Sequence, residues 1–212
     1  SDLRIASLGF SQSTFEGAMY SFVFMWTPAL KSDNEQGDET TSAYLGLIFA
    51  VFMICVMIGS SLFKMYSQKR EMLYKIPLVL HLTAFASMAM ITIFFEYKII
   101  VYSMFLVFEM TVGLFYPSYG VIKSEKIPED IRSAVMSIFR IPLNAFVVLL
   151  LLKIKFMPAY AVFMICAATH FLSFLSYLYF YLNTKSSEKG TDAGEEGMEL
   201  LGGSGSKDNM AQ

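Results

Sequence analysis

The chain has 212 residues, of which 55% are hydrophobic and only 16% are charged, and its formal net charge is -2. A soluble domain carries about 25% charged residues, so this composition excludes an ordinary soluble globular protein and favours a membrane protein. The slight negative charge gives no support to nucleic-acid binding.

Apolar runs recur along the chain at the length of about 20 residues that a helix needs to cross a bilayer. They predict an all-α membrane protein with six transmembrane helices and both ends on one side. The expected spans are roughly residues 5–30, 43–66, 76–95, 98–122, 131–154 and 157–182. Pro77, Pro128 and Pro158 fall at or just before the first turn of a span, where the missing N–H costs nothing.

The basic residues between the expected spans predict the orientation. The second and fourth connections hold more of them than the other connections, so by the positive-inside rule both termini are cytoplasmic. A multi-pass protein of the plasma membrane is expected. The second and fourth connections contain Lys64, Lys69, Arg70, Lys75, Lys123, Lys126 and Arg132, and the opposite side contains Lys31, Lys98, Lys153 and Lys155.

Residues 183–212 are rich in Gly, Ser and acidic residues and hold too few apolar side chains for a core, which predicts a disordered cytoplasmic tail. Within it, Glu196, Leu200 and Leu201 have the spacing of an acidic dileucine signal for a sorting adaptor; a chance match in an acidic segment is the alternative. The chain also lacks an initiator Met and a recognisable signal peptide, so we expect a missing N-terminal portion.

Three ionisable residues, Glu16, Glu109 and Arg140, lie near the middle of apolar segments. A charged side chain at the bilayer centre costs about 2.5–3.5 kcal/mol on the insertion scale, so such groups usually face a bundle interior or a polar cavity. Because antiparallel spans are registered by the bilayer, the three residues are expected at similar depth, where they can meet. They indicate a path for a polar solute.

Polar residues around these charges fall on single helix faces, because residues three and four positions apart share a face. In the fifth expected span the polar stripe ends about halfway across the membrane. The stripes comprise Ser133, Ser137, Arg140 and Asn144 in the fifth span, Gly9, Gln12, Ser13, Glu16, Tyr20 and Thr27 in the first, and Glu109, Gly113, Tyr116 and Gly120 in the fourth.

Proline and glycine residues near the charges predict bends and close helix contacts. Pro142 removes one backbone hydrogen bond, which should kink the helix beside Arg140 and provide a hinge. Pro117 breaks the backbone ladder one turn beyond Gly113. Gly113 and Gly120 let a neighbouring backbone approach closely. Pro142, Pro117 and Gly113 are the hinge candidates.

Arg140 is expected to bind an anionic or strongly polar substrate, because guanidinium stays charged and offers a planar fork of donors. Asn144, Tyr116 and Ser137 would add neutral hydrogen-bond donors.

Glu16 and Glu109 have two possible roles. Either one, removed from water at mid-depth, would pass a proton between the two sides of the membrane. The alternative is structural: Glu109 forms an ion pair with Arg140 that holds two helices together, while a hydroxyl or amide satisfies Glu16. Both hold at once if the substrate competes with Glu109 for Arg140.

The remaining reactive side chains predict neither an enzyme nor a cofactor. Cys55 and Cys166 lie within apolar runs and are expected to be small buried hydrophobes. His170 is expected to be a lone hydrogen-bonded histidine rather than a metal ligand or proton relay, and His81 is a weaker candidate still. The sequence contains no metal-ligand spacing, glycine-rich phosphate loop or Ser/His/Asp set.

Several short segments occur together in one order, at residues 15–17 and 24–28, 59–62 and 69–70, 109–118 and 139–144. In this order they resemble the C-terminal half of molybdate-anion transporters of the major facilitator superfamily. The resemblance implies a twelve-span protein whose second six-helix bundle is this chain and whose N-terminal six-span half is missing. Substrate would be held between the halves and exposed to each side in turn.

The substrate implied by the resemblance is molybdate, a tetrahedral dianion, with Arg140 as its charge partner. One Arg against two carboxylates is unfavourable for a dianion, so either the absent half supplies cations or the carboxylates are protonated during transport. Two alternatives stay open: a transporter of a neutral solute such as a sugar, with a structural Arg140, and a membrane scaffold or receptor that transports nothing.

Overall fold

The computed structural model describes residues 2–30, 39–154 and 156–204, and this part of the chain is helical apart from short turns. Side chains are described from residue 3 to residue 186, except at 31–42, 151 and 155. The all-α class expected from the sequence is confirmed for these residues. The helices in chain order are α1 (Asp2–Leu30), α2 (Glu39–Tyr66), α3 (Arg70–Ile93), α4 (Lys98–Lys126), α5 (Glu129–Ile154) and α6 (Ala159–Ser204).

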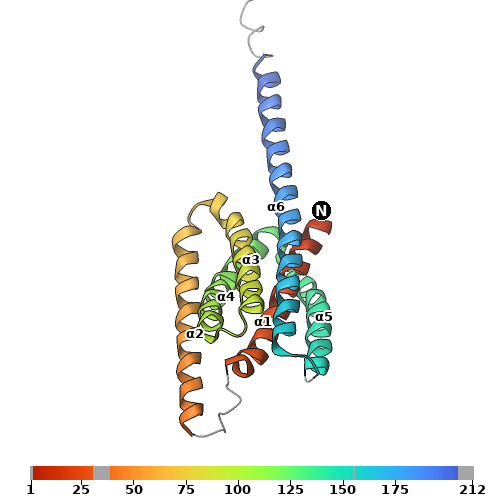
Figure 1. The fold of residues 1–212 in the computed structure, drawn as a ribbon. Coiled ribbons are helices and arrows are strands. Elements are labelled where there is room, and N and C mark those ends of the chain that lie inside the picture. Colours follow the sequence, from red (N-terminus) through yellow and green to blue (C-terminus); the bar gives the residue numbers. More distant parts are fainter. Residues whose placement is uncertain (1, 31–38, 155, 205–212) are drawn as a thin grey trace, which may run out of the picture.

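Four helices form the centre of the bundle, and two lie at its edges. α6 packs against α1 and α3, and α4 packs against α2 and α3. α2 and α5 lie at opposite edges (Figure 1), and α5 makes its one extensive described contact with α1. The start of α1 and the far part of α6 lie at the same end of the bundle (Figure 1).

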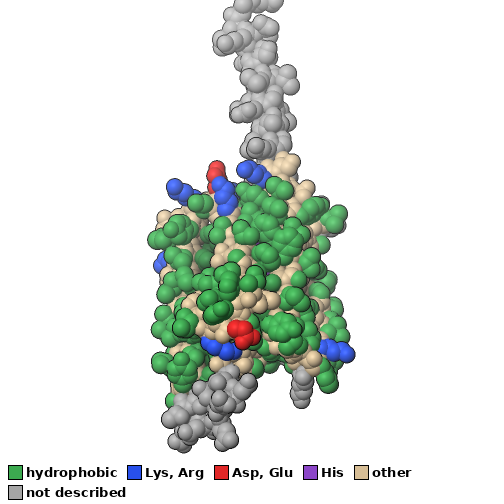
Figure 2. All heavy atoms as spheres, viewed as in Figure 1, with side chains coloured by type: hydrophobic (Ala, Val, Ile, Leu, Met, Phe, Trp, Pro, Cys, Tyr) green, Lys and Arg blue, Asp and Glu red, His purple; other side chains and the backbone are tan. Residues whose placement is uncertain are grey.

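Five of the six described helices are long and apolar enough to cross a membrane, namely α2 to α6. Hydrophobic side chains cover most of the visible face of the molecule, and Lys and Arg side chains lie near its two ends (Figure 2). This is the distribution expected of a multi-pass membrane protein, because the hydrocarbon core of a bilayer is about 30 Å thick.

The expected first span, α1, is not among those five helices. Its 29 residues would reach about 44 Å at 1.5 Å per residue, so length is not the reason. The many Ser, Thr and Gln residues of α1, together with Glu16, lower its hydropathy instead. These polar groups lie on a helix that packs against α4, α5 and α6 rather than standing alone in lipid.

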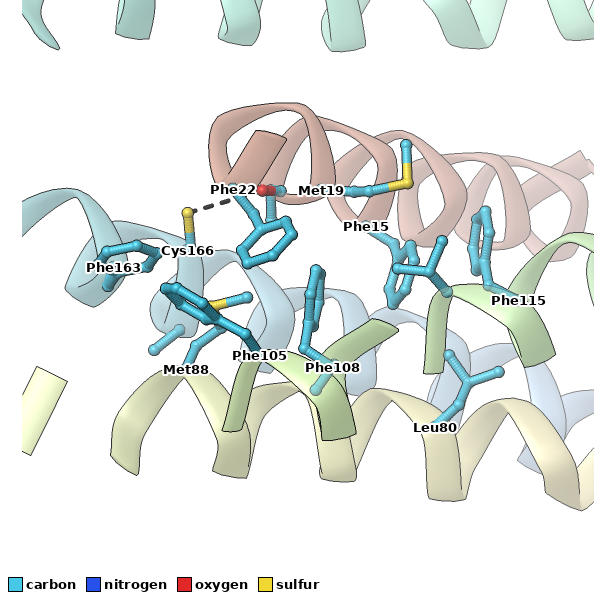
Figure 3. Close-up of a cluster of buried hydrophobic side chains, with 14 of the residues drawn as sticks. Phe15, Met19, Phe22, Leu80, Met88, Phe105, Phe108, Phe115, Phe163 and Cys166 are labelled. Atoms are coloured by element: carbon cyan, nitrogen blue, oxygen red, sulfur yellow. Dashed lines mark hydrogen bonds between the residues drawn. The ribbon is translucent and has the colours of Figure 1, made fainter. Parts of the chain in front are cut away.

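Aromatic side chains fill the core between α1, α3, α4 and α6 (Figure 3). Phe15 of α1 is fully buried, and its ring stacks on Phe115 of α4 at 4.0 Å between centroids. Phe22, two turns further along the same face of α1, packs against Phe105 at 5.0 Å between centroids. Helices in a bilayer associate through close van der Waals packing rather than through the hydrophobic effect, and these ring contacts hold α1 in the bundle.

A buried hydrogen-bond network joins the same four helices at one level. The Oγ atom of Ser11 lies 2.7 Å from the Tyr119 hydroxyl and 3.1 Å from Nε2 of His81. Nε2 of His81 lies 2.7 Å from the same Tyr119 hydroxyl. The Oγ atom of Ser173 donates to the Ser11 carbonyl at 2.6 Å, which adds α6. Four helices therefore share one polar contact point inside an aromatic core.

The prolines expected at span starts behave in two ways. Pro128 and Pro158 directly precede α5 and α6, as predicted. The prediction for Pro77 is wrong, because α3 begins at Arg70 and Pro77 lies inside it. The preceding turns contribute buried side chains to the core, including Leu73, and this packing outweighs the lost backbone hydrogen bond.

The last helix also differs from the expected boundary. α6 continues to Ser204, across much of the segment 183–212 whose composition predicts a disordered tail. Adding residues to an existing helix needs no new nucleation, which is the costly step of helix formation. Residues 205–212, and the side chains of the dileucine signal at Glu196, Leu200 and Leu201, lie outside the described part. The cytoplasmic location of this segment stays a prediction.

Glycine residues bring α2 and α4 into backbone contact. A Cβ added at Gly113 would overlap the Val56 carbonyl, and one added at Gly59 would overlap the Met110 carbonyl. Ser60 donates a hydrogen bond to the Gly113 carbonyl at 3.1 Å. The close approach predicted for Gly113 is confirmed.

The same prediction is wrong for the second glycine of that face. A Cβ added at Gly120 would meet nothing within 4 Å, since Gly120 is exposed.

Gly113→Ala should therefore destabilise the full-length protein by about 1–3 kcal/mol, because backbone atoms cannot turn away as a side chain can. Thermal unfolding of the detergent-purified protein measures the effect. Gly120→Ala on the same helix is the matched control and should be neutral or slightly stabilising, because Ala favours the helix over Gly. Equal melting temperatures for the two variants would contradict the α2–α4 contact described above.

Candidate functional site

Arg140 lies where three hollows meet along α5. The first, of about 540 Å³, lies between α1, α4 and α5, and its polar lining is Glu16, Tyr20, Tyr116, Arg140 and Asn144. The second, of about 120 Å³, includes Gln12, Ser13, Glu16, Lys123 and Arg140 in its lining. We call these two hollows, which share Glu16 and Arg140, the Arg140 cleft.

The third hollow, of about 450 Å³, continues from Arg140 toward the start of α5. Its polar lining is Glu129, Arg132, Ser133, Ser137 and Arg140. All four residues of the polar stripe expected on this helix thus line one hollow or another. The Ser137 hydroxyl donates to the Ser133 carbonyl at 3.0 Å, so in this structure its proton is used within α5.

The polar side of α1 supplies the opposite wall of the Arg140 cleft. Gln12 donates from Nε2 to Oε1 of Glu16 at 2.8 Å, so an amide satisfies this carboxylate, one of the two arrangements expected for it. The Oε1 atom of Gln12 is buried and has no hydrogen-bond partner among the described residues. The glutamine is therefore aligned by Glu16 alone.

Lys123 is the site residue that sequence reasoning missed. Hydropathy predicts that the fourth span ends at residue 122 and leaves Lys123 in a loop, but α4 continues to Lys126. Lys123 therefore lines the Arg140 cleft, where it interacts electrostatically with both Glu16 and Arg140.

A signal for Lys123 was present in the sequence. The polar face of α4 advances in steps of four and three residues, and Lys123 is the next position after Gly120 in that series.

Tyr116 and Asn144 border the same cleft from two helices. Tyr116 is 50% exposed, and its hydroxyl donates to the sulfur of Met19 at 3.5 Å, a weak acceptor. Asn144 is exposed on α5, one turn beyond Arg140. Both side chains offer donors that a bound anion can use.

Glu109 does not join the other two ionisable residues. It is only 6% exposed and does not line the Arg140 cleft; it lies near Cys55 of α2, with which it interacts electrostatically. Among the described side chains the structure has one ion pair, Lys75 with Glu71, so the expected pairing of Glu109 with Arg140 is absent there. The reason is that α5 packs mainly on α1 and makes no extensive described contact with α4.

The charges of the Arg140 cleft favour an anion. Arg140 and Lys123 provide two cations against the one carboxylate of Glu16. Guanidinium and ammonium groups form strong, charge-assisted hydrogen bonds with oxyanions. No group of three His, Cys, Asp or Glu side chains placed to hold a metal ion occurs in the described residues. The cleft is arranged for electrostatic binding.

Both histidines lie in the core, and their hydrogen bonding differs. His170 is fully buried, and neither ring nitrogen has a hydrogen-bond partner among the described residues; its ring packs edge-on against Phe15 at 5.0 Å. The expectation of a hydrogen-bonded His170 is therefore wrong. His81 is the hydrogen-bonded one, through Tyr119. Both are buried in the core, on the side of α1 away from the cleft.

Cysteine accessibility tests the cleft directly. In the full-length protein, Tyr116→Cys should react with a charged, membrane-impermeant thiol reagent about tenfold faster or more than Glu109→Cys, because access controls thiol reactivity. The two positions lie on one helix with 50% and 6% exposure, and the native Cys55 and Cys166 are buried. An unreactive Tyr116→Cys variant would mean that water does not reach the cleft.

Comparison with known proteins gives one family match. Residues 1–122 match the model of a major-facilitator family described as sugar transporters with 12 TM. The matched stretch contains Glu16, Glu109 and Tyr116 and ends just before Lys123. Arg140 and Asn144 lie beyond it.

Curated relatives match a longer part of the chain. Proteins named molybdate-anion transporter from Takifugu rubripes and Danio rerio are each 29% identical over 157 residues, and one from Xenopus tropicalis is 29% identical over 156. Each match covers 68% of this chain but only 30% or 31% of the relative. The chain thus spans less than half the length of the curated relatives it matches. No solved structure matches it.

Proposed function

Because the chain belongs to the major-facilitator family of sugar transporters with 12 TM, we propose that it is the second six-helix half of a secondary transporter for molybdate or a related oxyanion. In this proposal α1 is the first of six spans, and a preceding six-span half completes the protein. Both termini of this segment face the cytoplasm, and the protein resides in the plasma membrane. The names of the relatives and the basic residues of the α2–α3 and α4–α5 connections support it.

The observation that carries the proposal is that two cationic side chains, Arg140 and Lys123, line one cleft that contains a single carboxylate, Glu16. A tetrahedral dianion fits this set, because guanidinium binds two oxygens side by side and the ammonium adds a point charge. Tyr116 and Asn144 would donate to the remaining oxygens. Ser137 would contribute once its hydroxyl turns away from the Ser133 carbonyl.

Glu16 is the proposed proton-coupling residue. Two cations and one carboxylate leave one net positive charge in the empty cleft, and a bound dianion reverses its sign. A proton on Glu16 then restores neutrality, which lowers the cost of carrying the charge through the membrane. Glu109 is a second buried carboxylate, and it lies near α2 rather than in the cleft. Protonation of Glu109 would therefore change the contact between α2 and α4 and not the charge of the cleft.

Alternating access needs helices that bend, and the proposed hinges are Pro142, Pro117 and Gly113. Pro142 lies two residues past Arg140 in α5, so bending there moves Arg140 relative to the rest of the bundle. Pro117 lies in α4, between Gly113 and Lys123. Gly113 holds α4 close to α2 on the other side.

Removing either cation should weaken uptake of labelled molybdate by cells that express the full-length protein. Arg140→Gln and Lys123→Gln should each raise KM by about tenfold to a hundredfold, because a hydrogen bond to a charged group contributes about 1.5–3 kcal/mol. Lys75→Gln is the matched control: Lys75 pairs only with Glu71 one turn away on a partly exposed surface, and its loss should leave KM unchanged. Normal uptake by both cleft variants at equal surface expression would refute the anion site.

The coupling role of Glu16 predicts a change in pH dependence. Proton-coupled uptake by the wild type should rise as the external pH falls, and Glu16→Gln should remove this dependence while still exchanging molybdate across the membrane. Uptake and exchange at several external pH values measure both properties. If Glu109→Gln and not Glu16→Gln abolishes the pH response, the coupling residue is Glu109.

One observation favours a second candidate substrate. The matching family is described as sugar transporters, and a sugar would use Asn144, Tyr116 and Gln12 as neutral partners. Competition separates the two substrates: excess sulfate should inhibit uptake of labelled molybdate if the site binds oxyanions, whereas excess hexose should not. The reverse result, together with sugar uptake that survives Arg140→Gln, would favour the sugar.

A further inference from the structure

We infer that Gly9, Ser13 and Gly17 are positioning residues for the Arg140 cleft, because together they form the seat on which α5 rests. The inference depends on the proposed function for its meaning, since the cleft is the proposed anion site. We call these three residues the α1 seat. They do not need to touch substrate; they decide where Arg140 lies relative to Glu16 and Lys123.

Two positions of the α1 seat are glycines that lie directly against side chains of α5. A Cβ added at Gly9 would overlap the ring of Phe139, which lies directly on the α1 backbone. A Cβ added at Gly17 would come within 2.7 Å of Phe146 and 3.6 Å of Leu143. Small residues four apart let two helices approach closely, as they do here between α1 and α5.

The middle position of the α1 seat adds a directional contact. The Ser13 hydroxyl donates a hydrogen bond to the Phe139 carbonyl. This carbonyl belongs to the residue directly before Arg140, so the bond fixes the α5 backbone at the point from which the guanidinium extends. Pro142 weakens the α5 ladder nearby, which makes an external contact at this point more important for its geometry.

Residues of the α1 seat, and the α5 residues that contact them, are adjacent in sequence to cleft residues. On α1, Gln12 precedes Ser13 and Glu16 precedes Gly17; on α5, Phe139 precedes Arg140 and Leu143 precedes Asn144. A shift of α5 on the seat therefore moves the cleft groups by the same amount. α5 makes its one extensive described contact with α1, so no other helix corrects such a shift.

The test uses the full-length protein with Gly9→Ala. The added methyl group strikes the tip of the Phe139 ring, which is held between the two helices, so we expect α5 to move and KM for molybdate to rise by about tenfold or more, since displacements near 1 Å are costly at a binding or reacting site. The maximal rate should change less. Gly46→Ala is the matched control, because a Cβ at Gly46 meets nothing within 4 Å.

A second substitution separates positioning from general damage. Adding Phe139→Leu to Gly9→Ala replaces the ring that the methyl group strikes, so KM should return toward the wild-type value. A merely destabilised protein would not be rescued by a further core truncation. Should the Gly9→Ala protein fail to reach the membrane, Ser13→Ala removes the hydrogen bond to the Phe139 carbonyl without adding bulk and should raise KM by about fivefold; a changed distance between the labels described below separates this effect from loss of the hydroxyl in the cleft lining.

A distance measurement provides a readout that does not require transport. Spin labels at Leu3 and Ile131, which are exposed near the starts of α1 and α5, should move apart in Gly9→Ala and return in the double variant. An unchanged distance, or a changed distance with an unchanged KM, overturns the positioning role. Absence of any oxyanion uptake by the wild type overturns the proposed function instead, whatever distance the labels report.

Discussion

The constraint on which the whole arrangement depends is the polarity of α1, a helix that cannot stand in lipid alone. Its polar groups point in more than one direction: Ser11 bonds to Tyr119 in the core, whereas Glu16 faces the Arg140 cleft. Unsatisfied polar groups cost several kcal/mol in hydrocarbon, so the polar groups of α1 must face protein or a polar cleft. α6, α4 and α5 provide that cover. The same burial lets one helix contribute to the core and to the cleft.

The two sides of α1 are packed differently: one side belongs to the rigid core, and the other faces α5 and the Arg140 cleft. On one side, stacked aromatic rings around Phe15 and the shared hydrogen bonds of Ser11 join four helices. On the other side, α5 rests on small residues and leaves hollows along its polar stripe. Packed cores resist small displacements because interiors are close-packed. The cleft therefore has one firmly packed wall, formed by α1 and α4. Its other wall is α5, which is held mainly by its contact with the α1 seat.

The sequence predicts helices well here, because apolar runs of membrane length leave few alternatives. It also places Glu16 and Arg140 at similar depth, and the structure puts both in one cleft. It cannot say which way α4 is rotated or which helix α5 packs against, because glycine contacts such as Gly113 with Val56 and Gly9 with Phe139 set those relations. For that reason Glu109 was expected beside Arg140 and lies elsewhere. Lys123 was missed because a helix end placed by hydropathy stopped one residue short of it.

The placement of the two cations gives the proposed transport cycle a physical link between solute and conformation. Lys123 belongs to α4, which packs against α2 and α3 in the centre of the bundle. Arg140 belongs to α5, whose one extensive described contact is with α1. A dianion bound by both side chains would therefore connect the weakly held helix to the firmly held ones. A ligand shifts a conformational equilibrium only by its differential affinity for the two states. A solute contacted by one cation alone gains little from moving α5, whereas one that needs both cations favours the state in which α5 has closed on the bundle. In the proposed cycle, a preference for two negative charges and a movement of α5 would thus follow from the same pair of side chains.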